Sequence, residues 1–193
     1  MNKRCSGAPH KKLNKAGQKF LNDNGFHSPT DTDQHGSPIL HYAIGIGAPP
    51  SILHWILRSC DELGYPHHDE SIIQMKDNNG IAAIHVASVY GNLPALHFLV
   101  SDEHGLDVVE MVNSTTQDGL TPMLMACEKN HLEIVKLLHT KGAVAHGHMN
   151  QFLDFPLWTA SYHGNTDIVS WLLSVDGGAA AMDVHLQTAR GDT

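Results

Sequence analysis

The chain has 193 residues, of which 41 % are hydrophobic and 17 % charged, a composition that excludes the weakly hydrophobic, highly charged class of disordered proteins. Aromatic residues make up only 6 %, so we expect a core built mainly from aliphatic side chains. The formal net charge is −8, and the acidic excess lies beyond the first 19 residues. An acidic body argues against a folded surface that binds the phosphates of nucleic acids, so we expect no nucleic-acid partner.

The N-terminal part is predicted to form a leader and a capping helix. Residues 1–10 make a flexible basic leader, and residues 11–30 a capping helix with its linker, because apolar side chains such as Leu13, Phe20 and Leu21 follow helical spacing. The lysines fall largely off this stripe, so we expect the helix to present them to water. The leader has three possible roles: a targeting signal, a contact for an acidic partner, or merely solvated charge.

Four later segments share one pattern. Each contains an anchor alanine, and the residue four positions later is Gly or Asn. The anchors are Ala43, Ala87, Ala126 and Ala160, spaced by 44, 39 and 34 residues, and their followers are Gly47, Gly91, Asn130 and Gly164. Gly or Asn permits the left-handed backbone that ends a helix, so each segment predicts a pair of short helices. One pair cannot bury its apolar stripes alone, so we expect an all-α solenoid of stacked pairs around a continuous core.

The third segment carries the clearest motif. It begins Gly119-Leu120-Thr121-Pro122, continues His131-Leu132-Glu133-Ile134-Val135 and closes at Gly142-Ala143. This resembles the ankyrin repeat, whose pattern is G-x-T-P-L-H-x-A, then G-H-x-E-V-V-x-L-L, then G-A. The resemblance implies helix-turn-helix units with β-turn fingers in an ankyrin-repeat domain over 31–193. The implied repeats are 33–76, 77–115, 116–149 and 150–188, followed by the opening of a fifth at 189–193. We therefore expect a fragment of a longer protein, since a natural end would leave the fourth repeat without a polar cap.

Insertions and one altered repeat interrupt the pattern. Extra residues at 62–70 and 103–107 are expected to form loops. In the fourth repeat Leu153, Phe155 and Trp158 stand where the family has Gly, Thr and His. We expect an apolar finger there, which either docks the next repeat or extends the binding face.

Sixteen histidines raise the question of a metal or catalytic site. His41 and His85 match the His of the T-P-L-H motif, whose ring in the family hydrogen-bonds to the backbone of the turn, and His131 matches the G-H position. The local clusters are His67-His68-Asp69-Glu70 and His146-Gly147-His148, and neither has the spacing of a structural zinc site or of a metalloprotease. We expect no metal ion and no other cofactor.

Catalytic motifs are also missing from the sequence. It contains no G-x-S-x-G elbow and no Gly-rich phosphate loop, so we expect no enzyme activity. Three scattered cysteines suit a reducing compartment, and no apolar run approaches the ~18 residues of a membrane span. We therefore expect an intracellular, cytoplasmic monomer, with a nuclear location as the alternative. The glycosylation sequon Asn113-Ser114-Thr115 would then be idle.

In the ankyrin family the partner usually lies on the concave face, which is formed by turn tips and exposed positions of the first helix. The matching positions here hold apolar and aromatic side chains, notably Tyr90 and Tyr162, which favours a binding surface. The alternative is that these side chains only pack between repeats. The predicted partner-binding residues are Ile46, Asn79, Ile81, Val89, Tyr90, Asp118, Leu120, Glu128, Lys129, Asp154, Tyr162 and His163.

The sequence thus favours a non-catalytic protein–protein interaction module, an ankyrin-repeat scaffold or adaptor. A second hypothesis is the substrate-recruiting or regulatory portion of a larger enzyme or receptor whose catalytic domain lies outside this chain. A third is a histidine-based metal binder.

Overall fold

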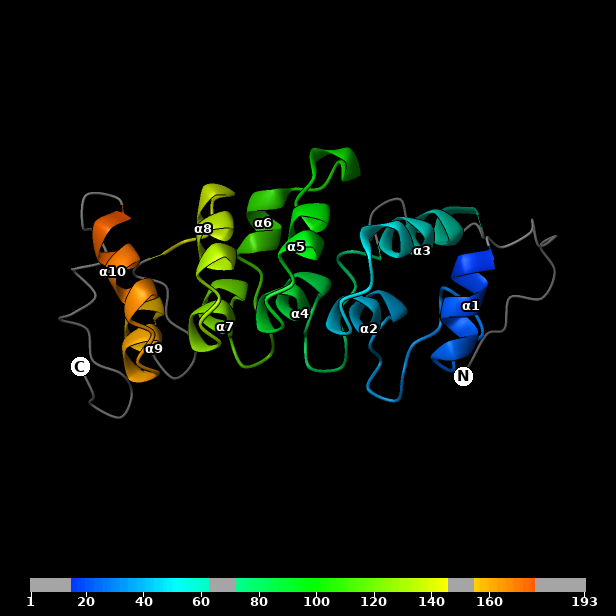
Figure 1. Cartoon of the computed structure of the whole chain (residues 1–193), viewed down its shortest axis with the longest axis horizontal. Helices are drawn as coiled ribbons and strands as arrows, with labels where there is room; N and C mark the ends of the chain where they lie inside the picture. The colour runs from blue at the N-terminus through cyan, green and yellow to red at the C-terminus, as the bar shows by residue number, and fades with distance from the viewer. Residues whose placement is uncertain (1–14, 63–71, 146–154, 176–193) are drawn as a thin grey trace.

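A computed structural model describes residues 15–62, 72–145 and 155–175, which form a row of short helices (Figure 1). The row begins with α1 (Lys15–Asp23) and continues with four helix pairs. The pairs are α2 (Ile39–Gly45) with α3 (Pro50–Glu62), α4 (Ala83–Val89) with α5 (Leu93–Leu99), α7 (Pro122–Glu128) with α8 (Leu132–Thr140), and α9 (Pro156–Tyr162) with α10 (Thr166–Ser174). In Figure 1 the first helices of the pairs form the lower row and the second helices the upper row. The predicted all-α solenoid is confirmed.

The anchor alanines lie where the first helices pack side by side. Helix α2 contacts α4, α4 contacts α7, and α7 contacts α9. Ala43, Ala87, Ala126 and Ala160 are all fully buried at these contacts. Because the separation of packed helices depends on the side chains between them, alanine permits a close approach.

Helix ends follow the local sequence as predicted. The backbone of Gly47, Gly91, Asn130 and Gly164 is left-handed, with φ of 72, 65, 61 and 71°. Asn130 is the described non-glycine residue with positive φ, and Asn is among the few side chains that tolerate this region. At the other end of α7, the hydroxyl of Thr121 accepts a hydrogen bond from the Leu124 amide.

Fingers project between the pairs and are joined to one another. In the second finger, the Asp77 carboxylate accepts hydrogen bonds from the amides of Asn79 and Ile81 at 2.8 and 2.9 Å. The backbone amide of Asn78 donates to His35 in the preceding finger at 3.1 Å, and that of Gln117 donates to Asn79 at 3.0 Å. The fingers are therefore held edge to edge along the lower side of the row in Figure 1.

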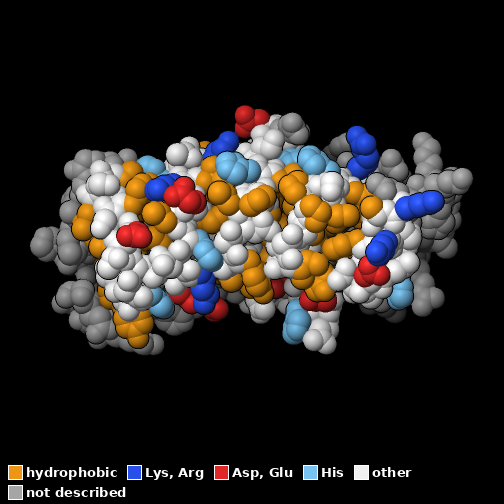
Figure 2. Space-filling view, viewed as in Figure 1, with side chains coloured by type: hydrophobic (Ala, Val, Ile, Leu, Met, Phe, Trp, Pro, Cys, Tyr) orange, Lys and Arg blue, Asp and Glu red, His pale blue; other side chains and the backbone are white. Residues whose placement is uncertain are grey.

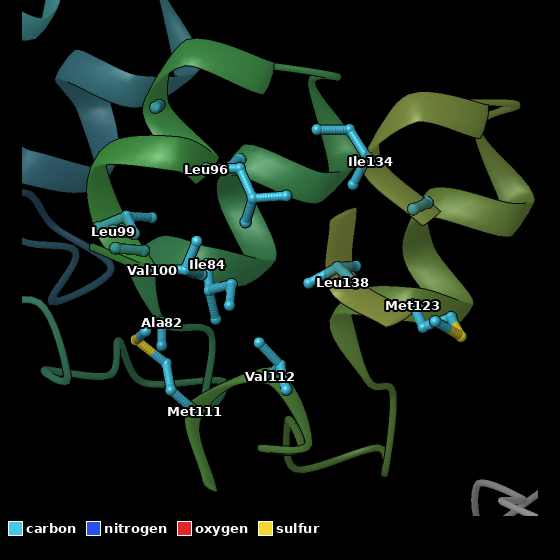
Figure 3. Close-up of a cluster of buried hydrophobic side chains, with 14 of the residues drawn as sticks. Ala82, Ile84, Leu96, Leu99, Val100, Met111, Val112, Met123, Ile134 and Leu138 are labelled. Atoms are coloured by element: carbon cyan, nitrogen blue, oxygen red, sulfur yellow. The ribbon is translucent and has the colours of Figure 1, made fainter. Parts of the chain in front are cut away.

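One continuous apolar core runs from Leu21 in α1 to Leu172 in α10. Figure 3 shows the joint between the second and third pairs, where side chains from α4 and α5 face those from α8. Leu96 and Leu138 are both fully buried there. Burial of such a side chain stabilises the fold by about 1.5–3 kcal/mol relative to exposure, so stacking supplies what one pair lacks.

The second insertion contains helical structure at its start and is followed directly by a helix. It begins within a 3-10 helix, η1 (Asp102–His104), and is followed by a short helix that the sequence pattern did not predict, α6 (Val108–Val112). Met111 and Val112 of α6 are buried in the core (Figure 3). The expectation of a loop at 103–107 is thus wrong in part, because η1 occupies its start and α6 packs directly after it.

Helix α1 covers the first pair. Gly17 is buried against Trp55 of α3, so that an added Cβ would overlap the indole ring. The lysines of α1 are exposed, as expected of a capping helix. The predicted leader 1–10, most of the first insertion at 63–70 and the fifth repeat at 189–193 lie outside the described residues, and the domain boundaries stay a prediction.

Candidate partner-binding surface

The C-terminal ends of the first helices expose large apolar side chains. Ile46 directly follows α2 and is 52 % exposed, and Tyr90 directly follows α4 and is 63 % exposed. Tyr162 is the last residue of α9 and is 70 % exposed. Together with the fingers, these helix ends make up what we call the finger-side face. Two of the three are aromatic, and large exposed apolar side chains in a row are unusual on a surface that meets only water.

A groove lies between α2 and α4 on this face. Its volume is about 530 Å³, and its lining is mostly apolar. One wall holds Tyr42 and Ile46, and the other holds Val86, Val89 and Tyr90. The remaining lining residues come from the fingers, the helix interiors and the third repeat: Ser37, His41, Gly45, Asp77, Ile81, His85 and Met125.

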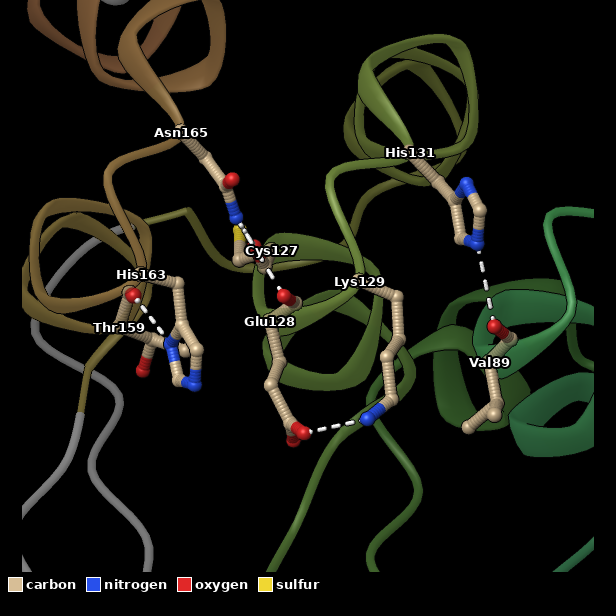
Figure 4. Close-up of polar contacts among 8 residues, drawn as sticks. All are labelled: Val89, Cys127, Glu128, Lys129, His131, Thr159, His163 and Asn165. Carbon is tan, nitrogen blue, oxygen red and sulfur yellow. Dashed lines mark hydrogen bonds and ion pairs between the residues drawn. The ribbon is translucent and has the colours of Figure 1, made fainter.

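An aromatic cluster lies at the end of α9. The rings of Trp158 and Tyr162 stack with centroids 5.0 Å apart and an interplanar angle of 16°. His163 meets Tyr162 edge-on at 5.2 Å, and its Nδ1 donates a 2.9 Å hydrogen bond to the carbonyl of Thr159 (Figure 4). The fourth repeat thus replaces the usual motif histidine with an indole that supports an exposed tyrosine.

Charged groups separate the groove from this cluster. Lys129 and Glu128 at the end of α7 form an ion pair of 2.6 Å (Figure 4). Both side chains are exposed enough that such a pair contributes little to stability. Figure 2 shows hydrophobic side chains across the middle of the molecule and acidic side chains scattered around them, some of them at the lower edge, where the fingers lie in Figure 1.

The other predicted partner-binding residues divide by burial. Asn79 and Asp118 are exposed on the fingers. Ile81, Val89 and Leu120 are only half-buried, so they contribute to packing between repeats as well as to the surface. Asp154 and most of the predicted apolar finger lie outside the described residues, while Phe155 is buried at the start of α9.

Sequence reasoning missed part of the groove. Tyr42, Val86 and Met125 occupy the variable position after the motif histidine or its equivalent. Each lies four residues before an exposed helix-end position such as Ile46 or Tyr90, and residues four apart share a helix face. That spacing is the signal that would have found them.

The two motif histidines differ in their hydrogen bonds. His85 accepts from the Ala82 amide at Nδ1, at 3.2 Å, and donates from Nε2 to the Ser114 carbonyl, at 3.1 Å, as the resemblance implies. His41 is 4 % exposed, and neither of its ring nitrogens has a hydrogen-bond partner among the described residues. The bond that the Nδ1 of His85 accepts cannot form in the first repeat, because the equivalent donor position is Pro38, which has no N–H.

Burial keeps both motif histidines neutral. Desolvation lowers the pKa of His41 to about 4, although the carboxylate of Asp77 and the backbone of Met75 oppose the shift. It lowers the pKa of His85 to about 4 as well, against the hydrogen bond to Ser114. These rings are therefore uncharged at neutral pH.

Neither metal nor thiol chemistry has a described site. Across residues 15–62, 72–145 and 155–175, no group of three or more His, Cys, Asp or Glu side chains is placed to hold a metal ion. The histidine clusters at 67–70 and 146–148 lie outside those ranges. Cys127 is fully buried, and burial raises the pKa of its thiol far above the usual value, so it is a core residue and not a nucleophile.

The amide of the sequon residue Asn113 has a structural role. Its Nδ2 donates to the carbonyls of Val109 and Gly142, each at 2.9 Å, and its Oδ1 accepts from the Val144 amide at 3.0 Å. These bonds join α6 to the end of the third repeat. A glycan on Nδ2 would disrupt them.

Comparisons with known proteins agree with this architecture. The family model described as Ankyrin repeats (3 copies) matches residues 109–188. The poly [ADP-ribose] polymerase tankyrase of Caenorhabditis elegans is 39 % identical over 79 residues, which are 41 % of this chain and 3 % of that protein. The human transient receptor potential cation channel subfamily A member 1 is 29 % identical over 136 residues, 70 % of this chain and 10 % of the channel. The mouse ankyrin repeat and SAM domain-containing protein 6 is 36 % identical over 86 residues, 42 % of this chain and 9 % of that protein.

The chain spans a tenth or less of the length of each of these relatives. Within the described ranges, no helix has both the length and the apolar character needed to cross a membrane. The matched family model identifies residues 109–188 as ankyrin repeats, and the helix pairs and fingers before them have the same architecture.

Proposed function

We propose that this chain is a non-catalytic interaction module that holds a protein partner on its finger-side face, the face that the family resemblance predicts to be concave. Ankyrin repeats are protein-interaction modules in general. The observation that carries the proposal is the exposure of Ile46, Tyr90 and Tyr162 at the C-terminal ends of three of the first helices. Tyrosine is enriched at the energetic centres of protein interfaces because it combines a large apolar ring with a polar tip.

The rigidity of this face supports the proposal. Fingers are joined by backbone hydrogen bonds, and each later repeat donates a side-chain hydrogen bond to the one before it. A face that is ordered before binding loses little conformational entropy when a partner docks. It therefore favours recognition without rearrangement.

The chemistry of the groove also favours binding over catalysis. His85 uses both ring nitrogens in backbone hydrogen bonds, so it is not positioned to act as a general base. The hydroxyl of Ser37, which lines the groove, lies 3.4 Å from the Oδ2 atom of Asp77, which is long for a hydrogen bond. A nucleophile needs a closer base within hydrogen-bond reach.

A second proposal is that the module recruits substrate or regulates within a larger protein. It is favoured by the similarity to a polymerase and to a channel, in each of which the matched part is small. In that case the finger-side face would hold a substrate protein or a neighbouring domain. The same surface residues would be used.

We place the module inside the cell and take it to be a monomer. The buried, unpaired Cys127 and the sparse cysteines fit a reducing compartment. Size-exclusion chromatography with light scattering tests the monomer, and fluorescence imaging of the tagged chain tests the location.

The test of the interaction surface is substitution of its tyrosines. Tyr90→Ala and Tyr162→Ala, alone and combined, should reduce the recovery of a cross-linked protein partner from cell extract, quantified by mass spectrometry. Val109→Ala is the matched control, because Val109 is 56 % exposed but belongs to α6, away from the finger-side face. Circular dichroism should show unchanged helicity in all variants. Full recovery with the double variant would disprove the proposed face.

A further inference from the structure

We propose that the groove between α2 and α4 binds an extended segment of a protein partner in which a basic residue lies next to a large apolar one. This inference rests on the proposed function, and it specifies which part of the finger-side face selects the partner and by what chemistry. Three features of the groove carry it: its apolar walls, its single carboxylate and the charge of the surrounding repeats.

The apolar walls account for the large apolar residue. The groove volume of about 530 Å³ lies within the range of specific ligand sites. Tyr90 leans across from α4 to α2, since a Cβ added to Gly45 would lie 3.5 Å from its ring carbon Cε2. Ile46 and Tyr90 stand at the rim and remain more than half exposed. An aliphatic or aromatic side chain inserted beside them would remove their apolar surface from water.

The carboxylate of Asp77 accounts for the basic residue. It is the charged group among the residues that line the groove. Its Oδ1 accepts the amides of Asn79 and Ile81, whereas Oδ2 receives within the described part of the chain only a 3.4 Å contact from Ser37. A carboxylate oxygen with remaining acceptor capacity favours a charge-assisted hydrogen bond from Lys or Arg.

The surface around the groove is also negatively charged. The described residues carry 14 Asp and Glu against seven Lys and Arg. On the fingers, Asp33 and Asp118 flank the position of Asp77. Lys129 is neutralised by Glu128, and Lys76 donates to the carbonyl of Thr115. A basic segment is therefore attracted to this edge, and an acidic one is repelled.

The shape of the groove favours a chain over a small molecule. Sites for small molecules enclose most of the ligand surface. Here the rim residues Ile46 and Tyr90 remain open to solvent, so the groove holds one side of its occupant and leaves the rest to continue along the face. An extended peptide segment meets that geometry.

The test uses a phage-displayed library of random peptides about 12 residues long, selected against the folded chain. Enriched peptides are then synthesised with a fluorescent label and titrated by anisotropy. We expect them to carry Lys or Arg within two positions of Leu, Ile, Met or Phe. Tyr90→Ala should weaken binding at least about tenfold, as for a residue at an interface centre.

The role of Asp77 has a matched control. Asp77→Asn keeps the oxygen that accepts the finger amides but removes the charge, and it should weaken binding about three- to tenfold and reduce its salt dependence. Asp33→Asn makes the same change in the first finger, where Asp33 accepts the amides of His35 and Ser37 but does not line the groove. It should change affinity less than about twofold.

The outcomes separate this inference from the proposed function. Peptides that lose binding with Tyr162→Ala but not with Tyr90→Ala or Asp77→Asn would overturn the inference and leave the finger-side face in use. Peptides whose affinity is unchanged by all three substitutions would disprove both the inference and the proposed face. Enrichment of acidic peptides, or equal losses with Asp33→Asn and Asp77→Asn, would overturn the role of Asp77. A dimer in sedimentation velocity that disappears with Tyr90→Ala would assign the groove to a second copy of the chain and also overturn it.

Discussion

The side-chain amide of Asn165 donates a 2.6 Å hydrogen bond to the backbone carbonyl of Cys127 in the preceding repeat (Figure 4). His131 makes the same kind of bridge to Val89 at 3.1 Å, and Asn92 to Ile44 at 2.9 Å. In each case the donor directly follows the left-handed Gly or Asn. The three joints between helix pairs therefore share one kind of side-chain bridge, in addition to apolar packing and the bonds between fingers.

Asn165→Ala should destabilise the C-terminal joint. It removes the donor to a buried carbonyl, a loss that costs about 1–3 kcal/mol. The side chain makes no capping bond within α10, so the loss reports on the bridge itself. Urea unfolding followed by circular dichroism measures the change. Thr166→Ala at the exposed neighbouring position is the control and should change stability by less than about 0.5 kcal/mol.

Gly17→Ala should release α1 from the first pair. The new Cβ would overlap the indole of Trp55, so the helix must shift, at a cost of about 1–3 kcal/mol. Tryptophan fluorescence should move to longer wavelength as Trp55 meets water. Lys19→Ala on the exposed side of α1 should leave the spectrum unchanged. An unshifted spectrum for Gly17→Ala at full stability would contradict the packing of α1.

Replacing the two motif histidines with Leu should have unequal effects. Leu124 already occupies this position in the third repeat, where it is buried. His41→Leu removes a ring that makes no hydrogen bond in the described structure, so it should be neutral or stabilising. His85→Leu breaks two hydrogen bonds and should cost about 1–3 kcal/mol. Chemical unfolding at neutral pH compares the pair, and equal losses would contradict the difference between the two rings.

The stability of the fold should decrease as the pH falls from about 6.5 to about 4. The pKa of both His41 and His85 is lowered from 6.5 to about 4, so the unfolded chain binds protons first. Their contribution is present above pH 6.5 and is lost as the pH falls toward 4, with each pKa unit worth about 1.4 kcal/mol. Unfolding free energies measured across this window check the slope. His41→Leu should flatten it, whereas substitution of the exposed His97 by Gln should not.

The sequence alone determined the helix pairs and their ends. A left-handed Gly or Asn and the Thr121-Pro122 start act within one turn of the chain, so their effect does not depend on distant residues. The anchor alanines also identified the stacked faces, because only a small residue repeated at each joint permits close approach.

The tertiary structure alone decided the groove and the packing of the insertion. Tyr42 is 35 residues from Asp77 and 44 from Val86 in the chain, and it meets them because α2 lies beside α4. The sequence pattern places Ile81 at the tip of a finger but does not show its neighbours, and in the structure the side chain is half-buried. The burial of a side chain depends on which side chains of the next repeat pack against it, and these contacts exist only in the folded stack.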